Sequence, residues 1–186
     1  MLTELVRKTS GQTEESRENA RILAETTREV LASMEQILWS VHPGNDTLEN
    51  LITFIVQYAG PFFAPTGIIC RHQAPAVLPD RKIDAATRKN VFLTVKEALN
   101  NLARHSGATE ARMVVTFADS LLTIEVTDNG RGLADAPAVS SVDGQRRSRR
   151  GHGLENMRAR IAEIGGQLVI EARPEGGTRV RLVAKV

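Results

Sequence analysis

The sequence predicts an α+β fold, in which helices alternate with β-hairpins behind a long N-terminal helix. Three observations support this class. Apolar residues recur at the helical period in several stretches and alternate with polar residues in others. A heptad pattern of apolar residues occupies the helix that precedes them. The helical stretches are 48–59, 85–105 and 154–164, and the paired strands are 112–117 with 121–127 and 168–172 with 178–184.

The composition is that of a globular protein in a reducing compartment. Of the 186 residues, 41% are hydrophobic and 25% are charged, and the formal net charge of +2 is too small to suggest a nucleic-acid partner. Cys70 is the single cysteine, which excludes an internal disulfide. Glycines and prolines interrupt the most apolar region, residues 51–69, so we expect no transmembrane span. We therefore expect a cytoplasmic protein, attached to a membrane only through segments upstream of this chain.

The N-terminal part, residues 1–44, is expected to form part of a helical hairpin and the linker after it. Its helix spans 14–41, and Pro43 ends it by disfavouring the helical conformation at His42, which we interpret as a linker residue. The helix either lies on its own domain or pairs with a second chain. Because so short a hairpin would leave its apolar seam exposed, we favour a homodimer through these helices. The seam consists of Ala20, Leu23, Thr27, Val30, Met34, Ile37 and Val41.

Residues 45–186 are predicted to form a second domain that opens with a helix. Asp46 is the expected N-cap of this helix, with Glu49 reaching back to it, and the helix should stop at Gly60-Pro61. A short strand is expected at 68–72.

The next helix, expected at 85–105 with Asp84 as its cap, has two unlike faces. A solvated polar face would carry mostly Lys and Glu, whereas this one carries Asn and Thr around a single Glu. Because Asn and Thr are poor helix formers, their row on one face suggests a site. The apolar face consists of Phe92, Val95, Leu99 and Leu102, and the polar face of Asn90, Thr94, Glu97, Asn101 and Arg104, followed by His105.

The strand at 121–127 runs into the stretch Asp128-Asn129-Gly130-Arg131-Gly132-Leu133. Glycine allows close approach of the backbone to a ligand, and the carboxylate can accept a hydrogen bond from an amino group. The simpler interpretation is an Asn-Gly turn after a strand. The polar helix face and a second group of glycines favour a binding site instead.

That second group, Gly151-His152-Gly153-Leu154, follows a polar stretch at 134–150 and is predicted to open a helix. The free N–H groups and the dipole of a helix N-terminus would bind an anion there. We interpret 134–150 as a mobile loop that also acts as a lid over an anionic ligand. Its basic residues are Arg146, Arg147, Arg149 and Arg150.

Together these groups describe a site for a magnesium nucleotide. Mg²⁺ prefers oxygen ligands and keeps several waters, so an Asn oxygen and the substrate's phosphates suit it. A carboxylate at the base favours adenine over guanine by roughly 1–3 kcal/mol, because adenine presents an amine where guanine presents an acceptor. The sequence has no Walker A motif, which excludes a P-loop as the phosphate-binding element.

Four motifs, in this order, resemble those of the GHKL ATPase superfamily (gyrase, heat-shock chaperone, histidine kinase and mismatch-repair ATPases). The stretch from Val95 to Ser106 is similar to the N box of bacterial sensor histidine kinases. The stretch from Ile37 to Leu48 looks like the join between dimerisation hairpin and ATPase domain, in the branch that pairs with helix-turn-helix response regulators. The resemblance covers essentially the whole chain. The motifs are Glu97-x-x-x-Asn101, Asp128-x-Gly130-x-Gly132, Gly151-x-Gly153-Leu154 and Gly176-Gly177-Thr178.

The resemblance implies a Bergerat-type α/β sandwich, a mixed, mainly antiparallel sheet backed by helices. It implies binding of ATP and Mg²⁺, with transfer of the γ-phosphoryl group to a histidine and onward to a response-regulator receiver domain. Asn101 would be the Mg²⁺ ligand, and Glu97 would polarise the attacking group or assist the metal. Asp128 would bind the adenine amine, with Thr178 nearby. The other nucleotide contacts would come from Arg104 and His105 near the phosphates and from Gly130, Gly132, Gly151, His152, Gly153 and Leu154.

One departure from the family pattern concerns the phosphoacceptor. The family phosphorylates a histidine on the first hairpin helix, usually followed by an acidic residue, and none of the four histidines here has that context. We therefore expect a shortened chain or a natural variant that lacks the phosphoacceptor and the upstream sensory module, and that binds ATP without autophosphorylation. The histidines stand in His42-Pro43, His72-Gln73, His105-Ser106 and His152-Gly153.

Two other functions fit the same motifs. A serine-directed kinase of the anti-sigma-factor type would share the Glu97–Asn101 helix but would not need the N-terminal seam. A non-catalytic, nucleotide-gated dimerisation module would use the seam as its working surface. Loss of all phosphotransfer in a Glu97 variant that still binds ATP would exclude this module.

Overall fold

The structure is a computed structural model that describes residues 42–132 and 144–186, and five helical residues upstream: Ser16, Asn19, Leu23, Met34 and Trp39. By contacts the chain forms two compact units, Met1–Trp39 and Ser40–Val186. The division between them lies a few residues before the boundary predicted at residue 44. Of the predicted seam, the structure describes Leu23 and Met34, and the other seam residues lie outside the described part. None of the helices in the described ranges has both the length and the apolar character needed to cross a bilayer.

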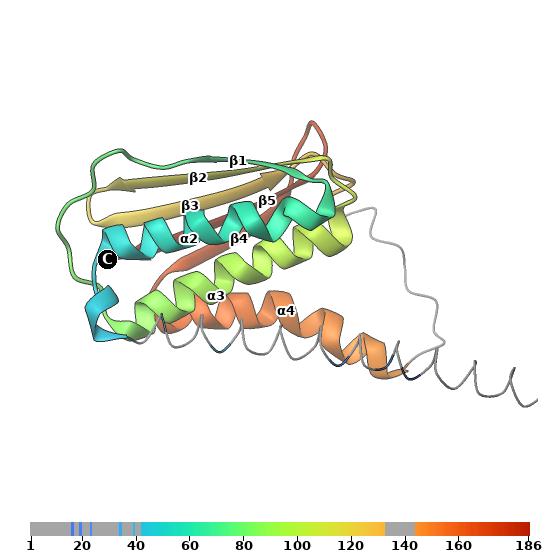
Figure 1. Ribbon diagram of the computed structural model, residues 1–186, viewed down its shortest axis with the longest axis horizontal. Coiled ribbons are helices and arrows are strands. Elements are labelled where there is room, and N and C mark those ends of the chain that lie inside the picture. Colours follow the sequence, from blue (N-terminus) through green and yellow to red (C-terminus); the bar gives the residue numbers. More distant parts are fainter. Residues whose placement is uncertain are drawn as a thin grey trace, which may run out of the picture. The chain divides into compact units, whose positions relative to one another are not determined.

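The second unit is a five-stranded sheet with helices on one face (Figure 1). The strands are β1 (Ile69–Gln73), β2 (Glu110–Ala118), β3 (Leu121–Asp128), β4 (Gln167–Ala172) and β5 (Thr178–Lys185). Their order in the sheet is β1-β2-β3-β5-β4. β1 and β2 are parallel and every other pair is antiparallel, which confirms both predicted hairpins. The sheet is therefore mixed and mainly antiparallel, as expected.

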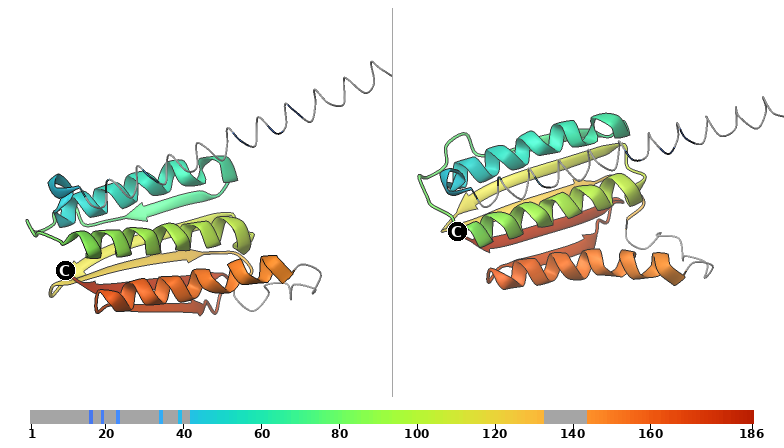
Figure 2. Two further views of the ribbon diagram at one scale, coloured as in Figure 1. Left: turned by 90° about the horizontal axis from the view of Figure 1, so that it is seen from below. Right: turned by 60° about the horizontal axis from the view of Figure 1, so that its bottom comes forward.

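Three α-helices lie side by side on that face of the sheet (Figure 2). They are α2 (Leu48–Phe63), α3 (Ala85–Asn101) and α4 (Gly144–Glu163). α3 lies in the middle, where the Phe92 ring packs on Phe54 and Tyr58 of α2 at centroid distances of 4.9 and 5.4 Å. The core fills the space between sheet and helices. Its largest fully buried side chains include Leu51, Ile55, Phe92, Leu99, Met113, Ile124, Met157 and Leu182.

Two predictions about α2 are wrong. Its N-cap is Thr47 rather than Asp46, because the Thr47 hydroxyl accepts a hydrogen bond from the Asn50 N–H at 3.2 Å. The Asp46 carboxylate instead pairs with Lys82 at 3.0 Å. The helix also continues through Pro61 to Phe63. Proline removes one hydrogen bond from this last turn, and burial of the Phe63 side chain, 1% exposed, offsets the loss.

The segment before α2 is fastened to the segment before α3. The Leu48 N–H donates to the Arg81 carbonyl at 2.8 Å, and the Ile83 N–H donates to the Asp46 carbonyl at 2.6 Å. These bonds flank an isolated antiparallel bridge between the two segments. The start of the domain and the start of α3 therefore form one small ladder.

Arg88, one turn into α3, binds both segments of this ladder from its buried side. Its side chain is 2% exposed. Nη1 donates to the Ile83 carbonyl at 2.5 Å, and Nη2 donates to the His42 carbonyl at 3.2 Å. His42 also caps the short 3₁₀ helix η1 (Pro43–Asn45) by accepting the Gly44 N–H on Nδ1 at 3.1 Å. The residue that sequence patterns assign to a linker is thus held by the domain.

Asp84 is the N-cap of α3, as predicted. Its Oδ1 accepts the Thr87 N–H at 2.9 Å, and its Oδ2 accepts the Thr87 hydroxyl at 2.6 Å. The hydroxyl bond is the main cause that lowers the pKa of Asp84 from its ordinary value of 3.8. Burial opposes this effect, and the backbone N–H groups of Thr87 and Ala86 add to it.

We expect Asp84→Ala to lower the free energy of unfolding by about 1 kcal/mol at neutral pH. Folding lowers the pKa of this carboxyl, so its stabilisation is fully present above the unfolded value of 3.8 and is lost as the pH falls through the lower folded value. Urea unfolding at a series of pH values measures this. Asp84→Asn, which caps without titrating, is the control. A penalty for Asp84→Ala that is the same at every pH would contradict the carboxylate cap.

Candidate functional site

Asp128 ends β3 with its side chain 5% exposed. Its Oδ1 accepts the N–H of Gly130 at 2.8 Å, so the loop after the strand curls back over the carboxylate. The Asn129 side chain fixes the same loop to the start of β2. Its Oδ1 accepts the N–H groups of Thr109 and Glu110 at 3.0 and 2.9 Å. The sequence shows this Asn only as a turn residue, but its side chain anchors the loop.

The loop after β3 packs directly on the end of the α3 segment. After α3 the chain forms a π-helix, η3 (Leu102–Ser106), a rare element that often marks functional sites. A Cβ on Gly130 would lie 2.3 Å from the Ser106 carbonyl oxygen, so only glycine fits. The Arg131 N–H donates to that oxygen at 2.9 Å, and Arg131 Nε donates to the His105 carbonyl at 2.8 Å. This junction brings two of the predicted motifs together.

The polar face of α3 is turned toward α4, a contact that the sequence does not predict. Asn90 is 5% exposed, and its Nδ2 donates to Glu163 Oε2 at 3.3 Å. Asn101 Nδ2 donates to Met157 Sδ at 3.9 Å. Both faces of α3 are therefore covered in this region, one by the sheet and one by α4. Thr94, between the two Asn residues, is 1% exposed.

Glu97 lies half-buried between these residues, against the backbone of α4. A Cβ on Gly153 would lie 2.5 Å from Glu97 Oε1. A side chain at position 153 would therefore displace the Glu97 carboxylate from its present place. Next to Glu97, burial lowers the pKa of Lys96, and the charge of Glu97 raises it in part.

The prediction that Gly151-His152-Gly153 opens a helix is wrong. α4 begins at Gly144, so these residues lie inside the helix. Backbone N–H groups inside a helix donate to carbonyls one turn back, and an N-terminal anion site requires free ones. Arginine is a good helix former, so the basic stretch 146–150 can extend the helix. Residues 134–143 of the predicted loop lie outside the described part, and nucleotide contacts by residues 151–154 remain a prediction.

The turn between β4 and β5 completes the site next to Asp128. Gly177 has φ of +87°, and a Cβ there would lie 1.9 Å from the Asp128 carbonyl oxygen. A Cβ on Gly132, with φ of +76°, would lie 3.1 Å from the Gly177 carbonyl oxygen. Thr178 follows as the first residue of β5. The two glycine motifs around Asp128 therefore pack on one another.

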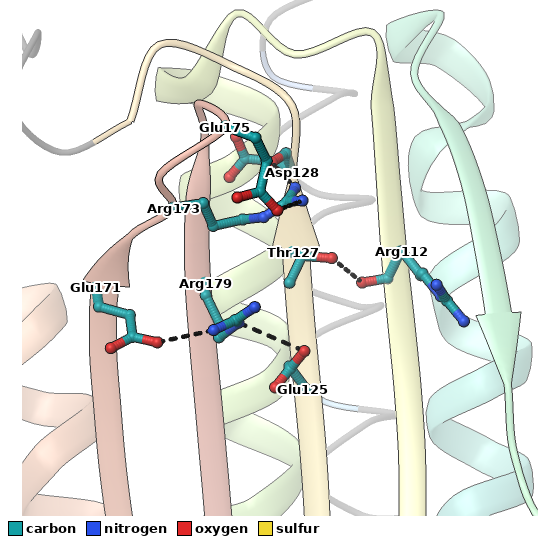
Figure 3. A network of polar contacts seen from close by, with 8 residues as sticks. All are labelled: Arg112, Glu125, Thr127, Asp128, Glu171, Arg173, Glu175 and Arg179. Atoms are coloured by element: carbon teal, nitrogen blue, oxygen red, sulfur yellow. Dashed lines mark hydrogen bonds and ion pairs between the residues drawn. The ribbon is translucent and has the colours of Figure 1, made fainter.

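Arg173, just before this turn, is a site residue that the sequence analysis missed. Its Nη1 donates to the main-chain carbonyl of Asp128 at 2.8 Å, and its Nη2 pairs with Glu175 at 2.5 Å (Figure 3). The only signal in the sequence is its place beside a Pro-Glu-Gly-Gly turn. Nearby, on the sheet face away from the helices, Arg179 pairs with Glu171 and Glu125 at 3.0 and 3.5 Å (Figure 3).

The structure thus places the predicted residues in two neighbouring groups. Around β3 lie Asp128, Gly130, Gly132 and Thr178. Along α3 and η3 lie Glu97, Asn101, Arg104 and His105, the last two with exposed side chains. No cluster of three or more His, Cys, Asp or Glu side chains within the described ranges could hold a metal ion by itself. A cation here would need the Asn101 oxygen together with oxygens of its ligand.

Comparisons with known proteins show the family and the fold of the chain. Residues 86–186 match the family "Histidine kinase-, DNA gyrase B-, and HSP90-like ATPase". The sensor protein VraS of Staphylococcus aureus is 31% identical over 107 residues, which are 58% of this chain and 28% of VraS. The chain thus matches less than a third of that relative's length.

Two solved structures share the fold. Full-length ShkA in complex with AMPPNP gives a TM-score of 0.59 at 17% identity, over 92% of this chain and 39% of ShkA. The catalytic domain of histidine kinase ThkA gives 0.55 at 16% identity, over 75% of this chain and 92% of that domain. The predicted α/β sandwich is confirmed.

Proposed function

This chain belongs to the histidine kinase-, DNA gyrase B- and HSP90-like ATPase family, and from that membership we propose that it is the ATP-binding catalytic core of a two-component sensor histidine kinase. One observation carries the proposal. The contact between Ser106 and Gly130 joins the end of the Glu97–Asn101 helix to the loop that holds the buried Asp128 carboxylate. A ligand with a base at one end and phosphates at the other would reach both groups.

Asp128 would bind the exocyclic amine of adenine. Its carboxylate is almost fully buried, and Gly130 fixes one of its oxygens, so its direction is set before the ligand arrives. Guanine would place a carbonyl oxygen where adenine has its amine, leaving two acceptors face to face. This should disfavour GTP by roughly 1–3 kcal/mol. Thr178, Gly130 and Gly132 would line the same end of the pocket.

Asn101 would hold Mg²⁺ together with the phosphates. Its Nδ2 points to Met157 Sδ, so Oδ1 is the atom available for a cation that prefers oxygen. The ion, when bound, would neutralise charge on the phosphates. Arg104 and His105 would add positive charge and hydrogen bonds at that end, and residues 151–154 of α4 would border it.

Glu97 would polarise the imidazole that attacks the γ-phosphorus. In this step the bond from phosphorus to the ADP oxygen breaks as a bond to the histidine nitrogen forms. None of the histidines of this chain has the expected phosphoacceptor context. The acceptor histidine would therefore lie outside these 186 residues, and the phosphoryl group would pass on to a response-regulator receiver domain.

We propose that residues 1–44 belong to a dimerisation hairpin and residues 45–186 to the ATP-binding domain. Two seam residues, Leu23 and Met34, are helical with exposures of 68% and 55%, which suits pairing with a second copy. Sedimentation that finds only monomer at high concentration would contradict the homodimer. The activity would take place in the cytoplasm, and any membrane attachment would lie upstream.

Thermal unfolding of the full chain with Mg-ATP or Mg-GTP tests the proposal. ATP at about a hundred times its Kd should add roughly 2.7 kcal/mol to the free energy of unfolding, which raises Tm by roughly 5–10 °C in a domain of this size. GTP at the same concentration should have a much smaller effect, and Asp128→Asn should lose most of the ATP shift. Equal shifts from both nucleotides would overturn adenine recognition, and the absence of any shift would overturn the proposal.

A further inference from the structure

Arg173 occupies the point where the pairing between β3 and β5 ends. The last register pair of that ladder is Thr127 with Arg179. Beyond it, Gly176 and Gly177, with φ of +97° and +87°, turn the chain away toward β4. The carbonyl of the next β3 residue, Asp128, receives the hydrogen bond from Arg173 Nη1 at 2.8 Å (Figure 3). A side chain thus supplies a donor where the pairing of β3 with β5 has ended, while β3 still pairs with β2.

The guanidinium is itself held in place. Its Nη2 lies 2.5 Å from Glu175, and its side chain is 22% exposed. The backbone of Arg173 closes the same turn, because its N–H donates to the Gly177 carbonyl at 3.0 Å and its carbonyl accepts the Gly176 N–H at 3.1 Å. Arg173 therefore connects the β4–β5 turn to Asp128 through both its backbone and its side chain.

We propose that Arg173 is a positioning residue for base recognition, which fixes the main chain of Asp128 so that its carboxylate faces the amine of the base. Two bonds then hold Asp128 from opposite ends: Arg173 on its carbonyl, and the Gly130 N–H on its Oδ1. Without the bond from Arg173, the end of β3 can shift, so the Asp128 carboxylate is still present but its position is no longer fixed. The inference rests on the proposed ATP-binding function and adds the residue that aims the adenine-reading group.

The test compares two nucleotides that differ only in the group that Asp128 would read. Mg-ATP has the exocyclic amine, and the magnesium complex of purine riboside triphosphate has a hydrogen there. Titration calorimetry gives the Kd of each for the wild type and for Arg173→Gln. We expect Arg173→Gln to weaken ATP about 10-fold, the effect of one charged hydrogen bond, and to change the Kd of the amine-free nucleotide less than about 2-fold. The preference for ATP over the amine-free nucleotide should fall by the ratio of these two fold-changes in Kd.

Two controls separate this role from general damage. Arg179→Gln makes the same substitution on the neighbouring strand, where the guanidinium bonds only side chains, and should leave both Kd values unchanged. Glu175→Gln removes the ion pair but keeps the bond to Asp128, and should also resemble the wild type. If Arg173→Gln does not fold, Arg173→Lys keeps one charged donor and should show a smaller loss of amine preference.

The outcomes distinguish this inference from the proposed function. The first outcome is a wild type that prefers ATP to the amine-free nucleotide, while Arg173→Gln weakens the binding of both nucleotides equally or of neither. This overturns the positioning role and leaves the proposed function standing. A wild type that binds neither nucleotide overturns the function itself. Equal affinity of the wild type for both nucleotides overturns base reading by Asp128, and the role of Arg173 with it.

Discussion

Replacing Glu97 by Gln should reduce phosphoryl transfer by about 10²–10⁴-fold, the range lost when a positioned acid–base group is removed. Gln has the same shape and keeps the contact with Gly153, where a Cβ would lie 2.5 Å from the Glu97 carboxylate. It cannot polarise an attacking imidazole as a carboxylate does. The Kd for Mg-ATP should change less than about 3-fold, because Glu97 lies on α3, apart from the Asp128 loop that would bind the base. The assay is transfer of labelled γ-phosphate to a histidine-bearing hairpin from a related kinase.

Glu163→Gln is the matched control for this prediction. Glu163 lies on the same interface between α3 and α4, where it accepts a hydrogen bond from Asn90 at 3.3 Å. Its replacement should leave transfer within about 2-fold of the wild type. A Glu97→Gln variant that transfers phosphate as fast as the wild type would remove Glu97 from the mechanism. A wild type that binds ATP but never labels any hairpin would favour the nucleotide-gated dimerisation module.

Gly177→Ala should cost about 3 kcal/mol or more in the free energy of unfolding. Two effects add. An alanine at φ of +87° is strained by roughly 1–2 kcal/mol. Its Cβ would also lie 1.9 Å from the Asp128 carbonyl oxygen, which is backbone and cannot rotate away. Relieving that overlap means moving the end of β3, so ATP binding should fall together with stability. Urea unfolding and nucleotide titration of the same sample measure both losses.

Gly176→Ala separates the two effects, because the neighbouring glycine has a similar φ of +97° but its nearest contact is 3.7 Å away. It should lose only the strain, roughly 1–2 kcal/mol. Gly60→Ala, with no atom within 4 Å and a position inside α2, should be neutral or stabilising by up to about 1 kcal/mol. If Gly177→Ala costs no more than Gly176→Ala, the close packing of the turn on Asp128 is wrong.

Local sequence signals predicted most of the sheet and the central helix. Alternation along β2, β3, β4 and β5 depends only on which face each side chain takes, and both hairpins formed as expected. Asp84 caps α3 as predicted, by accepting the Thr87 N–H. The apolar face of α3 is buried as predicted, including Phe92 and Leu99.

The errors arise where tertiary contacts outweigh local preference. Burial of Phe63 carries α2 past Pro61, and Lys82 takes the Asp46 carboxylate away from the helix start. The polar face of α3 is predicted as a site, but nothing in the sequence shows that α4 packs against it at Asn90 and Asn101. Helical propensity does not show which helix will lie beside another.

The structural roles of two arginines could not be predicted from the sequence for a related reason. Arg88 and Arg173 both donate to main-chain carbonyls. Every residue has such a carbonyl, so these bonds leave no recognisable spacing or partner type in the sequence. Gly130 and Gly177 stand in two of the four sequence motifs, but the backbone oxygens that make each glycine necessary belong to distant segments.

The buried side chain of Arg88 also decides how far the domain can be trimmed. A fragment cut after His42 would lose the carbonyl that accepts a hydrogen bond from Nη2 at 3.2 Å, and losing a hydrogen bond to a buried cation destabilises the fold. The smallest autonomous piece therefore starts at or before His42, and residues that look dispensable in the sequence belong to its hydrogen-bonded interior. Anyone who grafts this domain onto another protein should place the fusion point upstream of that histidine.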